Sequence, residues 1–162
     1  MVTLKELTPV IKTLNTKSNE VNQIIADLNA KLAKLNIGIS ETTGMIHASN
    51  WRIEYNEDNG LPIRRTRDVF ELGYGKVNEQ WELAIAQNEE TQEYVNGVPE
   101  KDNFGDDEAE CGERHWSSLL QASRALRIAA LSRVEQLITN IQLLAQAEIE
   151  SIDDARKLAD KL

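Results

Sequence analysis

Cysteine is almost missing from this chain: Cys111 is the only one in 162 residues, which excludes an intramolecular disulfide and favours a reducing environment. Long apolar runs are missing too, since no window approaches the roughly 18 apolar residues that a transmembrane helix requires. The first residues lack the basic start and unbroken apolar stretch of a signal peptide. We therefore expect a cytoplasmic protein without membrane contact.

Positive charge is also scarce, with 18 Lys and Arg against 27 Asp and Glu and a net charge of -9. Nucleic acids and anionic membranes are bound by positive faces, so the composition argues against both classes of partner. The acidity has two interpretations, solubility and docking on a basic partner. The hydrophobic content of 41% and the length predict one folded domain over residues 1–162.

The N-terminal stretch has an apolar residue at every third or fourth position from Leu4 to Leu35, and Ser18 is the single polar break. This five-heptad seam is typical of a helix that packs along its whole length on another helix. It predicts a long helix over residues 4–36, with a loose or kinked first turn at Pro9. The remaining faces are predicted to be solvated.

The middle of the chain, residues 39–87, changes from a helical period to a period of two, which is typical of half-buried strands. Gly73 and Gly75 predict bulges or a close contact with a neighbour. The alternating segments are Trp51–Tyr55, Phe70–Tyr74 and Trp81–Ile85.

The last two of these segments fit one hairpin with a two-residue turn at Asn78–Glu79. That turn places Tyr74 opposite Leu83 and Leu72 opposite Ile85, so the large apolar residues share one face of the sheet. We therefore expect an antiparallel sheet of about three strands.

Acidic residues without periodicity fill residues 88–113, which predicts a mobile loop. An apolar stripe wider than two residues per heptad then predicts a second long helix over residues 116–150, started by Trp116. Ser151 with Asp154 predicts a short C-terminal helix over residues 152–162. The expected fold is α+β: two long antiparallel helices in a coiled-coil-like stalk, with the sheet inserted between them.

No catalytic, cofactor or metal site is expected. His47, Cys111 and His115 are too few and too dispersed for a zinc site. Cys111 and His115 lie four residues apart, but nothing in the sequence implies the pocket or oxyanion hole that a nucleophile needs. The sequence therefore favours a protein that is not an enzyme.

Two clusters are candidate contacts with a partner protein. Arg64, Arg65 and Arg67 form the one basic cluster, expected in the loop before a strand, and either bind an acidic partner or pair internally. The acidic loop offers a contact for a basic partner. The acidic candidates are Asp106, Asp107 and Glu108.

The expected order of long helix, small sheet and long helix resembles in outline the subunits of prefoldin, a hexameric chaperone with coiled coils on a β platform. We expect a protein-protein interaction or scaffolding protein that forms homo-oligomers. The alternatives are a chaperone-like holder, which the outline of prefoldin implies, and an acidic inhibitor of a basic site on a partner.

Overall fold

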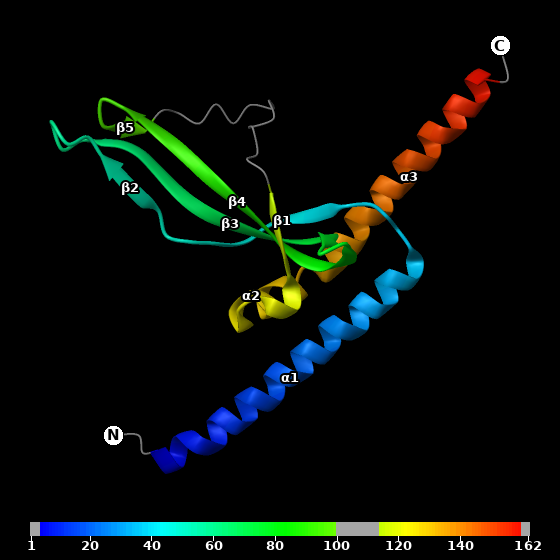
Figure 1. The fold of residues 1–162 in the computed structure, drawn as a ribbon, viewed down its shortest axis with the longest axis horizontal. Helices are drawn as coiled ribbons and strands as arrows, with labels where there is room; N and C mark the ends of the chain where they lie inside the picture. Colours follow the sequence, from blue (N-terminus) through cyan, green and yellow to red (C-terminus); the bar gives the residue numbers. More distant parts are fainter. Residues whose placement is uncertain (1–3, 100–113, 160–162) are drawn as a thin grey trace.

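The computed structural model describes residues 4–99 and 114–159, in which a six-stranded antiparallel sheet is packed against helices (Figure 1). The prediction of a two-helix stalk with a three-stranded insert is therefore wrong, because the fold is sheet-rich. The elements in chain order are α1 (Leu4–Leu35), β1 (Glu41–Ala48), β2 (Arg52–Tyr55), β3 (Pro62–Val77), β4 (Gln80–Val95), β5 (Val98–Pro99), β6 (His115–Ser118), the 3-10 turn η1 (Leu119–Gln121), α2 (Arg124–Leu131) and α3 (Val134–Ala159).

The centre of the sheet is the long β3–β4 hairpin. On the edge that faces away from β4, strand β3 pairs with β1 and β2. On the edge that faces away from β3, strand β4 pairs with β6 and β5. The predicted register is confirmed, with Tyr74 opposite Leu83 and Leu72 opposite Ile85. Asn78 and Glu79 both have positive φ, 48° and 67°, as a two-residue turn between twisted strands requires.

The hairpin is twice as long as the sequence predicted, because β3 and β4 each span 16 residues. Residues 88–95, expected in an acidic loop, belong to β4 instead. Their carboxylates face the arginines of β3, with Arg64 opposite Glu93 and Arg67 opposite Glu90. Opposite charges across an antiparallel pair favour strand over loop. Residues 100–113 of the expected loop lie outside the described residues.

Helix α1 matches the expected helix in extent, and Pro9 lies inside it. Its apolar seam was predicted to pack along the other long helix, but it packs on β4, η1 and the short helix α2. Ile25 and Leu32 are buried against the sheet and its flanking turns, in one cluster with Leu83 and Leu119. A heptad repeat is close enough to the 3.6-residue period of a straight helix for the seam to cover a sheet as well as a helix.

The predicted long helix over residues 116–150 is wrong, because that stretch contains β6, η1, α2 and the start of α3. Ser123 precedes α2, and its Oγ accepts a hydrogen bond from the backbone N–H of Leu126 at 3.3 Å. Such an N-cap requires a non-helical residue at this position. Ser132 ends α2. Residues 152–159 continue α3, so the separate C-terminal helix is also wrong.

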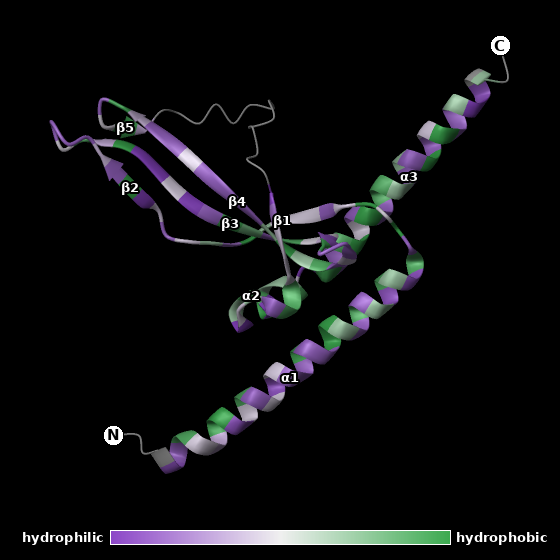
Figure 2. Ribbon diagram, in the orientation of Figure 1, coloured by the Kyte–Doolittle hydropathy of each residue, from purple (hydrophilic) through white to green (hydrophobic). Residues whose placement is uncertain are grey.

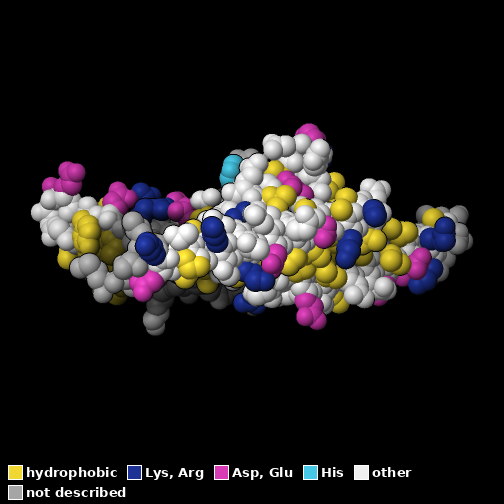
Figure 3. Space-filling view, turned by 90° about the horizontal axis from the view of Figure 1, so that it is seen from below, with side chains coloured by type: hydrophobic (Ala, Val, Ile, Leu, Met, Phe, Trp, Pro, Cys, Tyr) yellow, Lys and Arg dark blue, Asp and Glu magenta, His cyan; other side chains and the backbone are white. Residues whose placement is uncertain are grey.

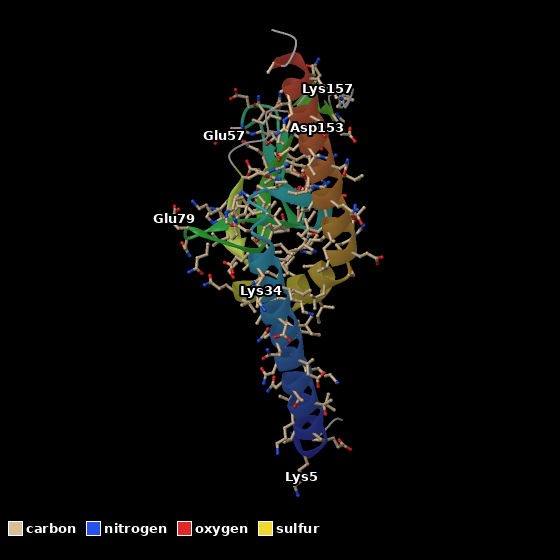
Figure 4. The ribbon with its side chains drawn as sticks, turned by 90° about the vertical axis from the view of Figure 1, so that its right-hand side faces the viewer. Lys5, Lys34, Glu57, Glu79, Asp153 and Lys157 are labelled. Atoms are coloured by element: carbon tan, nitrogen blue, oxygen red, sulfur yellow. The ribbon has the colours of Figure 1, made fainter. Side chains whose placement is uncertain are left out.

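The two long helices contact different parts of the sheet. Helix α1 packs on β4, η1 and α2, whereas α3 packs on β1 and β3. The helices leave the sheet at opposite ends of the molecule (Figures 1 and 4). The resemblance in outline to prefoldin rested on the order of long helix, small sheet and long helix. The described chain differs from that order, because it has a six-stranded sheet and a short helix, α2, before α3.

The second face of the sheet holds Trp116, which belongs to β6 rather than to the start of a helix. Gly73 and Gly75 alternate with Leu72 and Tyr74 along β3, so they lie on the face opposite the main core. A Cβ atom on Gly73 would lie 2.5 Å from the Trp116 ring, and one on Gly75 would lie 2.8 Å away. The predicted close contact of these glycines with a neighbour is confirmed.

Candidate functional site

The basic cluster lies on β3, in the part of the sheet that extends away from the helices (Figure 1). The Nη2 of Arg64 lies 2.7 Å from Oε2 of Glu54 on β2, and the Nε of Arg67 lies 2.6 Å from Oε2 of Glu90 on β4. The hydrogen bond to Glu54 is the main cause of the raised pKa of Arg64. These two arginines therefore hold neighbouring strands together, which was one of the two interpretations of the sequence.

Arg65 and Arg67 also contact Trp51, which lies between β1 and β2. The guanidinium carbons of the two arginines are 4.2 Å and 4.5 Å from the centre of the Trp51 ring. Contacts at these distances are cation–π interactions. Trp51 was expected in a strand, and it instead covers the arginines from the adjacent loop.

A second charged cluster, which was not predicted from the sequence, lies on the same arm of the sheet. The guanidinium of Arg52 donates to Oδ2 of Asp68 at 2.6 Å and to Oε2 of Glu89 at 3.0 Å. The hydrogen bond from Arg52 is the largest influence that lowers the pKa of Asp68, and a hydrogen bond from the Gln87 amide acts in the same direction. This cluster links the three strands β2, β3 and β4.

The remaining predicted candidates are not brought together. Asp106, Asp107, Glu108 and Cys111 lie outside the described residues. Among residues 4–99 and 114–159, no group of three His, Cys, Asp or Glu side chains is arranged to hold a metal ion. His47 lies on β1, where its ring is 5.8 Å from that of Phe70.

A mainly apolar groove of about 320 Å³ lies between the sheet and α2. Its polar groups are the side chains of His47, Ser49 and Ser123, and none of the three is placed as a nucleophile with a base. The lining residues are His47, Ser49, Phe70, Ser123, Ala125, Leu126 and Ala129.

The most distinctive surface is formed by the two helix ends that project from the sheet. Residues 5–17 of α1, the α1 extension, are all exposed, as are residues 144–157 and 159 of α3 apart from half-buried Ala145. We call residues 144–159 the α3 extension. Figure 2 shows hydrophobic residues recurring along the full length of both helices, and Figure 3 shows hydrophobic patches on the surface of one side of the molecule.

Each extension continues an apolar stripe that is buried closer to the sheet. At 100° per residue, Leu7, Ile11 and Leu14 lie on the same face of α1 as Ile25 and Leu32. Ile25 is 0% exposed, whereas Leu7 is 43% and Leu14 is 40% exposed. The stripe therefore continues, with Ser18 as its one polar residue, past the point where the sheet and α2 cease to cover it.

Helix α3 shows the same change along its length. Leu137 and Ile141 are buried, whereas Leu144, on the next turn, is 38% exposed and Ile152 is 65% exposed. A shallow hollow of about 360 Å³ runs along the extension. It is lined by Leu144, Ala147, Glu148, Ser151 and Ile152.

Comparison of the chain with protein-family models, curated proteins and solved structures finds no significant match. None of the described helices is sufficiently long and apolar to cross a membrane. The fold and surface of this chain are therefore the basis for inferring its function.

Proposed function

We propose that this chain is a non-enzymatic interaction module that self-associates through its projecting helices. The observation that carries the proposal is that two apolar helix faces, buried near the sheet, continue uncovered for several turns. Large apolar side chains in a contiguous stripe on a surface are typical of a protein-protein contact. The helices project from the part of the sheet where α1 packs on β4 and α3 packs on β1 and β3.

The projecting helices also need a partner for their own stability. The extensions continue helices that the sheet already nucleates, but most of the stability of a helix in a protein comes from packing of its apolar face, which the extensions lack within one chain. Contact of the apolar stripe with another surface removes the stripe from water, which stabilises the complex by about 25 cal/mol per Å² of apolar surface buried. Association therefore orders the extensions and covers their apolar faces in one step.

The test is the molar mass of the full chain by light scattering across a range of concentrations. A wild-type chain that stays at the mass of 18.3 kDa at every concentration contradicts self-association. Leu14→Glu places a charge in the stripe, so it should weaken the oligomer. Thr16→Glu is the matched control, because residue 16 lies on the exposed opposite face of the same turn.

A further inference from the structure

The two extensions carry net charges of opposite sign. Three lysines and one glutamate give the α1 extension a net charge of +2, and four carboxylates with two basic residues give the α3 extension -2. These residues are Lys5, Glu6, Lys12 and Lys17 on α1, and Glu148, Glu150, Asp153, Asp154, Arg156 and Lys157 on α3. The extensions are therefore complementary in charge as well as being alike in their apolar stripes.

The extensions also match in length. At a rise of 1.5 Å per residue, the 13 residues of the α1 extension span about 20 Å and the 16 residues of the α3 extension about 24 Å. Charge and length thus make each extension a fitting partner for the other. Within one chain they cannot meet, because Lys5 lies at one end of the molecule and Lys157 at the opposite end (Figure 4).

A second copy brings them together. Both helices run in roughly the same direction along the long dimension of the molecule (Figures 1 and 4). A two-fold rotation about an axis perpendicular to that dimension places the α3 extension of the second copy beside the α1 extension of the first, and the reverse contact forms at the other end. The two contacts are equivalent, which closes the dimer.

We propose that the partner of this surface is a second copy of the chain, held in a closed dimer by two antiparallel pairs of an α1 extension with an α3 extension. This inference rests on the proposed function and specifies its contact. The apolar stripes form the seam of each pair, and the hollow along α3 receives side chains from α1. The opposite charges favour this pairing over α1 with α1 or α3 with α3.

Charge reversal separates these pairings. Lys12→Glu with Lys17→Glu changes the α1 extension from +2 to -2, and Glu148→Lys with Glu150→Lys changes the α3 extension from -2 to +2. Either pair of substitutions alone puts like charges in both contacts, so we expect the dimer Kd at low salt to rise about tenfold or more. All four substitutions in one chain restore opposite charges and should return the Kd close to that of the wild type.

Like-with-like pairing predicts neither the loss nor the rescue, because each of its contacts carries equal charges in the wild type and in every variant. A quadruple variant that dimerises no better than the two double variants, or double variants that dimerise as well as the wild type, would overturn the inference while self-association stands. A mass that grows beyond two chains with concentration would also overturn it, since an open head-to-tail array is not a closed dimer. A wild-type monomer would remove both proposals. Circular dichroism confirms that each variant is folded.

Discussion

Asn29 Oδ1 accepts a hydrogen bond from the backbone N–H of Leu83 at 2.7 Å. Leu83 lies on β4 just before the segment that pairs with β6. Among the described strand pairings, no strand lies beside Leu83 on the edge of β4 that faces away from β3. A side chain of α1 therefore occupies the place of a neighbouring strand. At the opposite edge of the sheet, the side-chain amide of Asn140 of α3 donates to the carbonyl of Thr42 on β1 at 3.0 Å. Each long helix is thus fixed to the sheet by one amide.

Replacing Asn29 tests this arrangement. Asn29→Ala leaves the Leu83 N–H without its acceptor in a largely buried position, so we expect a loss of about 1–3 kcal/mol in the free energy of unfolding. Urea denaturation measures the loss. Asn19→Ala is the control, because Asn19 is exposed on the same helix and the two substitutions have the same effect on helix propensity. Equal stability of the two variants would contradict a specific role for Asn29.

The close contact of Gly73 with Trp116 leads to a second prediction. Gly73→Ala forces a methyl group to within 2.5 Å of the indole ring and 2.8 Å of the Glu41 carbonyl oxygen. We expect destabilisation of about 1–3 kcal/mol, as for other overpacked sites, measured by thermal or urea unfolding.

The source of that strain can be identified with a double variant. Removal of the ring in Trp116→Ala should reduce the cost of Gly73→Ala, although the contact with the Glu41 carbonyl keeps part of it. Strictly additive effects of the two substitutions would show that the ring is not the source of the strain.

The sequence predicted the hairpin register correctly because two independent signals agreed there. The two-residue turn and the alternation of apolar residues both place Leu72 opposite Ile85. The half of the hairpin that includes residues 88–95 was not predicted, because a stretch rich in acidic residues is typical of a loop. Only their register with Arg64 and Arg67 shows that these charges are paired across strands.

The partner of the α1 seam could not be read from its heptads. A seam identifies the apolar face of a helix but not the kind of element that covers this face. Ile25 and Leu32 are buried against the sheet and its flanking elements, although the same heptads would suit a helical partner. The exposure of Leu7 and Leu14 depends on where the sheet and α2 end, which is a property of the assembled fold. Likewise, the apolar residues after Trp116 belong to several elements, so their combined stripe was wider than that of one helix.

The turn at Asn78–Glu79 offers a stabilising change. Glu79 has φ of 67°, a left-handed conformation that costs most side chains about 1–2 kcal/mol and glycine almost nothing. Glycine also gives the unfolded chain more conformational entropy, which offsets part of this gain. Glu79→Gly should therefore raise the free energy of unfolding by about 0.5–1 kcal/mol. Loss of the exposed Lys76–Glu79 ion pair subtracts little.

A matched variant separates the backbone from the charge at this turn. Glu79→Gln removes the same ion pair but retains the left-handed strain, so its melting temperature should not rise. A gain for Glu79→Gln equal to that for Glu79→Gly would assign the effect to charge instead of backbone conformation.

The pKa of Asp68 predicts how the arm of the sheet responds to acid. The hydrogen bond from Arg52 lowers this pKa in the folded protein below the value of about 3.9 in an unfolded chain. The contribution of Asp68 to stability is therefore complete above about pH 4 and is lost as the pH falls through the folded pKa. Asp68→Asn should destabilise the protein at pH 7 by up to about 1 kcal/mol, because Arg52 is half exposed.

Urea unfolding at pH 7, pH 4 and pH 2.5 tests the Asp68 prediction. The difference between the wild type and Asp68→Asn should shrink as the carboxyl becomes protonated in both folded and unfolded chains. Glu89→Gln is the control: Glu89 binds the same guanidinium at the longer distance of 3.0 Å with a side chain that is 56% exposed, so its effect at pH 7 should be smaller. The effect of removing the charge on the free energy of unfolding must vanish at low pH, where the carboxyl of the wild type is protonated. A destabilisation of Asp68→Asn that stays constant across the pH range would therefore show that the amide disturbs packing.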